Sequence, residues 1–318
     1  RIGPVSHALL PLNSSVLVRA RAAEAIGKAG LAAGSGALKR AINDEAPSVR
    51  IAAMNALGDA RVMEMKPRLV EIGRTEEGPE AIFAYAALYK MGQADMLIDI
   101  TNAATLPDAE VRMAAIGVLG RLKRPSSLAL LSQAVYDPNP SVRAFAAGAL
   151  GEFGSPGGVA PLTHALGDEM AMVRGVAAGS LGRLGLKENR PLLQALTRDP
   201  SLQVRASAVE SLLRLGDSSV LLLAADLARN PDPSIRGSAA QALSAASDKE
   251  ALSLLQALLQ DQQPLPRLMA AKALGKVSGP VIPILLKGLQ DTDEAVRIAA
   301  AGSLLHQTAR AARTTRRP

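Results

Sequence analysis

An aspartate and an arginine six residues apart recur along the chain, and this pair is the first candidate for chemistry. The stretch DPNPSVR begins at Asp137, and DPSLQVR begins at Asp199. The arginines, such as Arg143, Arg174 and Arg205, recur every 31 residues, except for a last spacing of 30 and one gap of 62. A catalytic pair is needed once per active site, so a pair that recurs through the whole chain is predicted to be structural.

The position of each aspartate favours this structural interpretation. It falls in a predicted turn before a helix, where a short acceptor can satisfy free backbone N–H groups at the helix start. The arginine lies one turn inside that helix and can reach the aspartate of its own or the adjacent unit, so we expect a ladder of ion pairs. The predicted ladder consists of Asp44, Arg50, Asp137, Arg143, Asp168, Arg174, Asp199, Arg205, Asp261, Arg267, Asp291 and Arg297.

Other residues that could carry catalysis are sparse. The chain has no cysteine and three histidines, His7, His164 and His306, which lie in distant units and cannot together form a metal site. No GxSxG, HExxH or phosphate-binding Gly-rich loop with its lysine occurs. We therefore predict no catalytic residue, no metal site and no cofactor, and hence no enzyme.

The elements that carry the pair are two helices per repeat unit. In the second helix, alanine recurs four residues after the valine that precedes the arginine, and leucine recurs eight residues after it. These places share one face of an α-helix and predict its buried stripe. In the third unit, the alignment places Ala84 where the other units have their arginine, and it places Ala87 and Met91 in the buried stripe. This alignment requires a shift of three residues that is compensated within the same unit.

The D-x5-R-x2-A frame and the ALG close of the second helix resemble the HEAT-repeat superfamily, in the short-repeat form of phycobilin-lyase-like proteins. The resemblance covers residues 4 to 307 and implies an all-α fold: a right-handed solenoid of about ten two-helix repeats. It implies a protein scaffold more than any one activity, although some members bind nucleic acid or act as enzymes. The expected units are about 4–30, 31–61, 62–92, 93–123, 124–154, 155–185, 186–216, 217–247, 248–277 and 278–307, followed by a basic tail, 308–318.

Composition agrees with an array of closely packed helices. The sequence is 48% hydrophobic but only 2% aromatic, so small aliphatic residues must fill the interior. Its net charge is +7, of which Arg310, Arg313, Arg316 and Arg317 in the tail supply four charges. No apolar run reaches the ~18 residues that a membrane-spanning helix needs. The tail is expected to be flexible, or alternatively a helical cap on the last repeat.

A line of small residues is predicted on the inner, concave face, opposite the buried stripe of the second helices. Glycine in mid-helix costs about 1 kcal/mol relative to alanine, so this line suggests either a trough for a partner segment or tight crowding of neighbouring helices. Two tyrosines at its end are candidate anchors. The predicted partner-binding residues are Tyr85, Tyr89, Met113, Gly117, Gly120, Ala144, Gly148, Gly151, Gly175, Gly179 and Gly182.

A column of cations near the ends of the second helices has two interpretations. It can complement the negative helix C-termini, or it can form a basic rim for an acidic partner or a phosphate backbone. Its members are Lys28, Arg121, Arg183, Arg214 and Lys276. The favoured function is a non-enzymatic scaffold for a protein or peptide. Nucleic-acid binding through the rim and tail is the alternative, and a bilin or cofactor lyase is a third.

Overall fold

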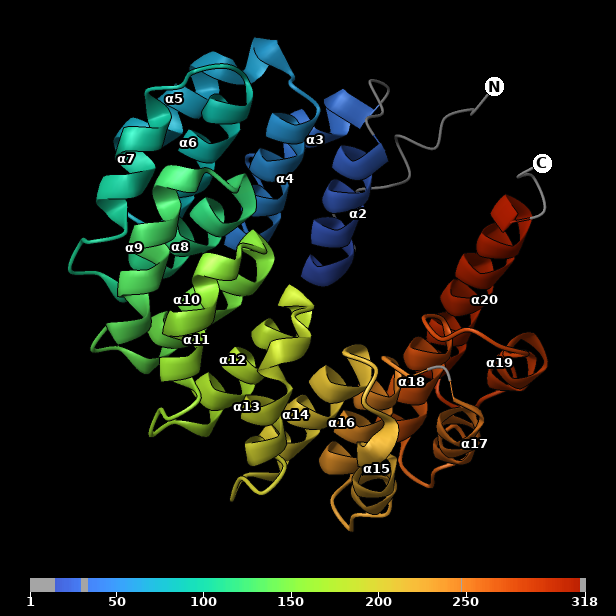
Figure 1. Ribbon diagram of the computed structural model, residues 1–318. Helices are drawn as coiled ribbons and strands as arrows, with labels where there is room; N and C mark the ends of the chain where they lie inside the picture. The colour runs from blue at the N-terminus through green and yellow to red at the C-terminus, as the bar shows by residue number, and fades with distance from the viewer. Residues whose placement is uncertain (1–14, 30–33, 247, 315–318) are drawn as a thin grey trace. The chain divides into compact units, whose positions relative to one another are not determined.

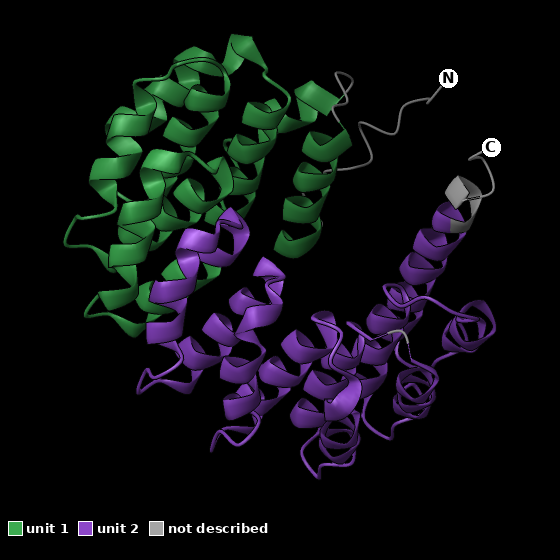
Figure 2. Ribbon diagram, viewed as in Figure 1, with its two compact units in different colours: residues 1–149 green, residues 150–318 purple. Residues whose placement is uncertain are grey.

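The computed structural model describes residues 15–29, 34–246 and 248–314, and its regular structure there is entirely helical, without strands (Figure 1). The chain divides into two compact units, residues 1–149 and residues 150–318, shown in separate colours in Figure 2. The boundary falls inside helix α10, Pro140–Phe153, and the sequence repeat runs through it unchanged. The repeat pattern therefore carries no signal of this division.

In the described residues, each repeat from the second onward consists of a short first helix and a longer second helix, as predicted, and the first repeat shows its second helix. The first helices are α3 (Ser35–Ala41), α5 (Lys66–Thr75), α7 (Met96–Ala103), α9 (Leu128–Gln133), α11 (Val159–Ala165), α13 (Arg190–Leu196), α15 (Leu221–Ala228), α17 (Lys249–Leu258) and α19 (Ile282–Gly288). The second helices besides α10 are α2 (Val16–Ala29), α4 (Pro47–Asp59), α6 (Pro79–Lys90), α8 (Ala109–Leu122), α12 (Ala171–Leu184), α14 (Leu202–Arg214), α16 (Pro233–Leu243), α18 (Pro264–Leu274) and α20 (Glu294–Thr314). This arrangement is an α-solenoid.

The alanine–leucine stripe forms the core of both units. In α4, Ala53 and Leu57 are fully buried, and in α14 the equivalent Ala208 and Leu212 are fully buried as well. Burying one leucine side chain contributes roughly 1.5–3 kcal/mol, so the stripe supplies most of the driving force for stacking. Consecutive second helices pack against each other, α2 on α4 and α4 on α6 in unit 1, and α12 on α14 and α14 on α16 in unit 2.

The third repeat keeps the common register, so the predicted three-residue slip is wrong. Ala84 and Leu88 are fully buried and occupy the alanine and leucine places that Ala87 and Met91 were expected to fill. Ala81 therefore stands in the arginine place. Its number is equally distant from those of the arginines in the second and fourth repeats, since 81 − 50 = 31 and 112 − 81 = 31.

The residue that ends each second helix confirms this register. Six residues spaced by 31 adopt a left-handed backbone: Arg61 (φ 50°), Gly92 (φ 97°), Lys123 (φ 51°), Gly154 (φ 76°), Gly185 (φ 73°) and Gly216 (φ 79°). Glycine adopts this conformation without steric cost, whereas other residues lose about 1 kcal/mol or more there. Gly92 is thus a helix-ending residue of the repeat and not part of the inner face.

The C-terminal segment continues the last helix. Helix α20 runs through Thr314, so residues 308–314 are helical, which agrees with the helical alternative for this segment and not with a flexible tail from residue 308. The Arg310 guanidinium donates a hydrogen bond to the Ser278 hydroxyl at 2.9 Å. Arg316 and Arg317 lie outside the described residues, as does His7. In the described part of the chain, no helix combines the length and apolarity that a bilayer crossing requires.

Candidate functional site

The recurring arginine joins each repeat to the next one. In unit 2, Arg174 Nε and Nη2 each donate a hydrogen bond to the Asp199 carboxylate, both at 2.8 Å. Its Nη1 donates to the carbonyl oxygen of Asp168, in the turn before its own helix, at 2.9 Å. The Asp199 carboxylate also accepts a hydrogen bond from the backbone N–H of Ser201 at 2.8 Å. The pair therefore fixes two successive turns, and the predicted structural ladder is confirmed.

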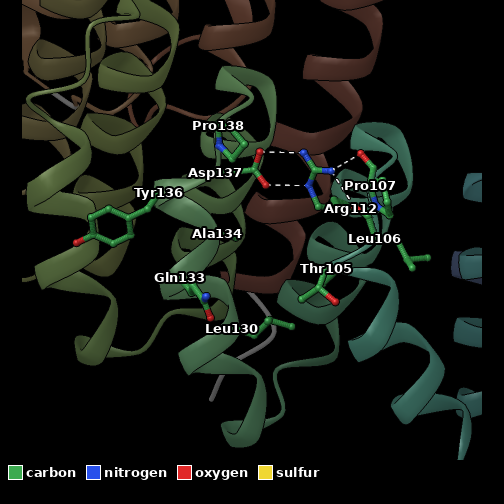
Figure 3. A pocket seen from close by; sticks show the side chains of 11 residues that line it. Thr105, Leu106, Pro107, Arg112, Leu130, Gln133, Ala134, Tyr136, Asp137 and Pro138 are labelled. Atoms are coloured by element: carbon green, nitrogen blue, oxygen red, sulfur yellow. Dashed lines mark hydrogen bonds and ion pairs between the residues drawn. The ribbon is translucent and has the colours of Figure 1, made fainter.

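The same two-pronged bond recurs through both units. It joins Arg19 to Asp44, Arg112 to Asp137, Arg236 to Asp261, and Arg267 to Asp291. Figure 3 shows the rung of Arg112 and Asp137 beside a hollow of about 510 Å³ between the turns. A hollow of about 350 Å³ lies beside the first rung. Because the hollows accompany the rungs, we assign them to the architecture.

The ladder pattern changes at three rungs, and at two of them the other end of the rung is changed to match. Arg50 bonds Glu80 because Thr75 holds the place where the other rungs have their aspartate. Ala81, in the arginine place, corresponds to Leu106, in the aspartate place, so both charges of that rung are absent. The aspartate place that corresponds to Arg205 holds Asn230, and Arg205 Nε donates instead to the carbonyl oxygen of Asp199.

The ladder carboxylates are held in the ionised state. The hydrogen bond from the arginine of the preceding repeat is the main cause that lowers their pKa values below the usual range, and burial opposes it. The carboxylates with lowered pKa are Asp44, Asp199, Asp261 and Asp291. A permanently ionised, saturated carboxylate serves the scaffold and is a poor acid catalyst.

Tyr85 does not lie on the predicted inner face. Its hydroxyl donates a hydrogen bond to the Gly73 carbonyl oxygen in α5, and its ring packs on the Gly73 backbone. Burial is the main cause that raises the pKa of the Tyr85 hydroxyl. The corrected register explains this placement, because Tyr85 falls on the side of α6 that faces the first helix. The prediction that Tyr85 anchors a partner there is wrong.

Three of the predicted trough glycines serve crowding between neighbouring second helices. A Cβ on Gly120 would lie 2.8 Å from the Ala149 Cβ, and one on Gly182 would lie 2.8 Å from the Ser211 Cα. A Cβ on Gly151 would lie 2.7 Å from the Ser180 Cβ. Contacts under 3.0 Å require the helices to move apart, so these glycines are explained by packing. Tight crowding, the alternative explanation of the glycine line, is confirmed at these places.

Two other predicted glycines have no neighbour close enough to exclude a side chain. A Cβ on Gly117 or Gly179 would meet only the guanidinium of an arginine one turn later, at 3.6 Å in each case. Those arginines are Arg121 and Arg183, two of the predicted rim cations. A Cβ on Gly175 would make only ordinary contacts with α14. Of the remaining inner-face residues, Met113 in α8 and Gly148 in α10 are half-buried, and Ala144 in α10 is buried.

The open glycines of unit 2 lie in a surface groove of about 570 Å³ over α12, α14 and α16. Gly175 and Gly179 form its floor on α12, beside Met172, which is half exposed. Ser207 and Glu210 line it on α14. The groove therefore combines accessible helix backbone with hydroxyl and charged side chains.

Arg183 lies across one end of this groove. Its Nη2 donates a hydrogen bond to the Ser180 hydroxyl at 2.6 Å. Burial lowers the pKa of the guanidinium, and the Glu210 carboxylate opposes that shift. Glu210 itself accepts hydrogen bonds from Arg214 at 2.7 Å and from Gln241 at 3.2 Å. The sequence analysis assigned Arg183 to the basic rim and Gly179 to the inner face, and the structure places both in the same groove.

The remaining rim cations are divided among internal contacts. The Arg121 guanidinium lies 5.9 Å from the centre of the Phe83 ring, close enough for a cation–π contact. Lys28 lies in the last turn of α2, which fits the helix-terminus explanation. Lys276 follows the end of α18. In the corrected register Lys90 joins this column, and its ammonium pairs with Asp59 at 2.6 Å.

Metal-type chemistry finds no support in the described residues. No group of three His, Asp or Glu side chains there could hold a metal ion. His164 is exposed in α11, and His306 Nδ1 lies 2.9 Å from the Gly275 carbonyl oxygen. These two histidines lie in separate repeats.

A family model for HEAT repeats matches residues 7–89, 94–182, 127–213, 159–244, 189–265 and 253–312. Among solved structures, the chain is similar to YibA of Escherichia coli (17% identity, TM-score 0.49, covering 92% of this chain and 97% of that one). It is also similar to the CpcE–CpcF complex of phycocyanin lyase from Nostoc (17%, 0.47, 85% and 93%) and to human deoxyhypusine hydroxylase (21%, 0.35, 79% and 98%). Identities this low carry no information about activity. No curated protein matches the chain.

Proposed function

Because the chain belongs to the HEAT-repeat family, we propose that it is a non-enzymatic scaffold that binds a protein or peptide along the inner face of its second helices. The observation that carries this proposal is the groove over α12, α14 and α16. Its glycines leave helix backbone accessible, so a partner segment can approach more closely than side chains would allow.

Packing does not account for the groove glycines. Gly179 has no neighbour that an added Cβ would clash with, yet it stands in mid-helix at a cost of about 1 kcal/mol relative to alanine. Gly182, three residues later, is required by the approach of Ser211. A residue that lowers stability without a packing reason fits a surface that a partner occupies.

The test fills the groove and leaves the core intact. Replacing Gly179 with leucine puts a side chain over the groove floor. The matched control is Gly36→Leu, at a helical glycine in α3 whose added Cβ would have no neighbour within 4 Å. The measurement is affinity capture from the native source, with mass spectrometry to quantify the specific partner. The amount captured should fall at least tenfold with Gly179→Leu and should be retained with Gly36→Leu. Equal capture by both variants, with unchanged thermal unfolding, would refute the groove.

Nucleic-acid binding is the second candidate, because cations gather near the ends of the second helices in unit 1. Its support is weaker along this cation column, where Arg214 of the predicted rim pairs with Glu210, and Lys90, which the corrected register adds, pairs with Asp59. Affinity for a phosphate backbone falls steeply with salt, so a titration of complex stability against salt separates the candidates. The scaffold proposal expects a shallow dependence for the captured partner.

A further inference from the structure

A further hollow, of about 370 Å³, lies in unit 1 near the C-terminal ends of α4, α6 and α8. Three cationic side chains from three successive repeats line it: Arg61 after α4, Lys90 at the end of α6, and Arg124 after α8. Tyr89 and Met63 add an aromatic and an apolar surface. The hollow belongs neither to the ladder nor to the groove of unit 2.

Among the residues that the structure describes, the positive charge of this hollow is only partly neutralised. Lys90 pairs with Asp59 at 2.6 Å. Neither Arg61 nor Arg124 has an ion pair with any residue that the structure describes. Arg124 Nε donates to the Tyr89 hydroxyl, and its guanidinium lies 5.4 Å from the centre of that ring, so the ring holds the cation at the hollow. Three cations against one carboxylate leave a charge of about +2.

Arg61 also occupies an unusual backbone position. It has φ 50°, and the equivalent residue is glycine in four of the six repeats with this left-handed ending. Another cation, Lys123, stands at the same place two repeats later, with φ 51°. Cations thus replace glycine in repeats that flank this hollow, although glycine fits the conformation better.

We propose that this hollow binds a phosphate monoester carried on the protein segment that the scaffold holds. This proposal rests on the proposed function. A phosphorylated side chain carries a charge of about −1.5 to −2 at neutral pH, which matches the uncompensated charge of the hollow. Guanidinium groups donate paired hydrogen bonds to phosphate oxygens, and both Arg61 and Arg124 have such donors available. Tyr89 and Met63 can contact the carbon atoms that carry the phosphate.

Methionine-methyl NMR can test this site without knowledge of the partner. The chain has nine methionines, of which Met63 and Met91 line this hollow and Met172 lines the groove of unit 2. The probes are N-acetyl-phosphoserine amide, its unphosphorylated counterpart and inorganic phosphate, at matched ionic strength. We expect saturable shifts of the Met63 and Met91 methyl signals with the phosphorylated amino acid and none with its unphosphorylated counterpart. Free phosphate should cause weaker shifts or none.

The variant for this test is Arg61→Gln with Arg124→Gln, both at exposed positions. The charge-matched control is Lys187→Gln with Arg198→Gln, two cations of unit 2 that lie outside this hollow. The first pair should weaken phosphoserine binding at least tenfold, and the control pair should leave it unchanged. Absence of Met63 and Met91 shifts, or equal affinity in both pairs, would overturn the site.

Two further outcomes would also redirect the proposal. Tighter binding of free phosphate than of phosphoserine would overturn the protein-borne source in favour of a small anion. Tighter binding of a single-stranded oligonucleotide, with the same methyl shifts, would replace it with nucleic acid. Gly179→Leu reports separately on the groove, so loss of capture by that variant without phosphoserine binding would reject this site and keep the scaffold.

Discussion

Two glycines in α12 that look equivalent in the sequence should respond to alanine in opposite directions. A methyl group on Gly179 would meet only the Arg183 guanidinium, at 3.6 Å, which is ordinary contact. A methyl group on Gly182 would lie 2.5 Å from the Ser211 hydroxyl and 2.8 Å from the Ser211 Cα. That hydroxyl is buried and donates a hydrogen bond to the Ala178 carbonyl oxygen at 2.9 Å.

The two substitutions share one gain and differ in packing. Alanine stabilises a helix interior by roughly 0.5–1 kcal/mol relative to glycine, so Gly179→Ala should raise the free energy of unfolding by that amount. Gly182→Ala receives the same gain but forces α12 and α14 apart, and overpacking costs about 1–3 kcal/mol. Its net effect should be a loss of about 1 kcal/mol or more, because the Ser211 hydrogen bond is also disturbed.

Urea unfolding of the whole chain, followed by far-UV circular dichroism, measures both effects as shifts of the midpoint. The wild type lies between the two variants in this prediction. A destabilised Gly179→Ala would show that this glycine is needed for packing and would remove the main support for the groove. An unchanged Gly182→Ala would show that the helices are less crowded than the structure indicates.

Two further predictions concern the ladder. The carboxylates of Asp44, Asp199, Asp261 and Asp291 have pKa values below those of the unfolded chain, so their stabilisation is present above about pH 4 and is lost as the pH falls through the folded pKa. The thermal midpoint should therefore drop at acidic pH, and Asp199→Asn should reduce that drop; an equal drop in this variant would contradict the ladder's role. Asn230→Asp should complete the rung of Arg205 and raise the free energy of unfolding by about 0.5–1 kcal/mol, measured by urea unfolding. The gain should vanish in an Arg205→Gln background, and its persistence there would show another origin.

The sequence predicted the helical hairpins and the ladder because the residues that form both recur periodically along the chain. Alanine at four places and leucine at eight places after the valine define a buried face, and an aspartate 24 or 25 residues after most of the arginines defines the rung. The same reliance on the arginine caused the error in the third repeat. Ala81 removed the anchor there, so the alignment moved to Ala84, although the left-handed Gly92 keeps the common spacing.

The inner face was predictable only in part, because helix periodicity does not determine how closely neighbours approach. Gly179 and Gly182 look alike in a helical projection, but Ser211 lies against only the second of them. The position of the Arg183 side chain over Gly179 depends on its side-chain conformation, which the spacing of residues in the sequence does not determine. The cationic hollow in unit 1 was missed because Arg61 and Arg124 lie in turns of different repeats. The sequence signal that could have revealed this hollow was the presence of three cations at the ends of successive repeats.

The constant interval between an arginine and its carboxylate affects how such a gene can change in length. Recombination between similar repeats adds or removes DNA in multiples of one period. Loss of residues 206–236 would bring Asp261 to the place that Asn230 now holds relative to Arg205 (261 − 31 = 230), so the new junction would carry a complete pair. Descendants of this chain can therefore gain or lose whole 31-residue repeats and keep an arginine–carboxylate pair at such a junction, whereas a deletion that is not a multiple of the period would disrupt the pair.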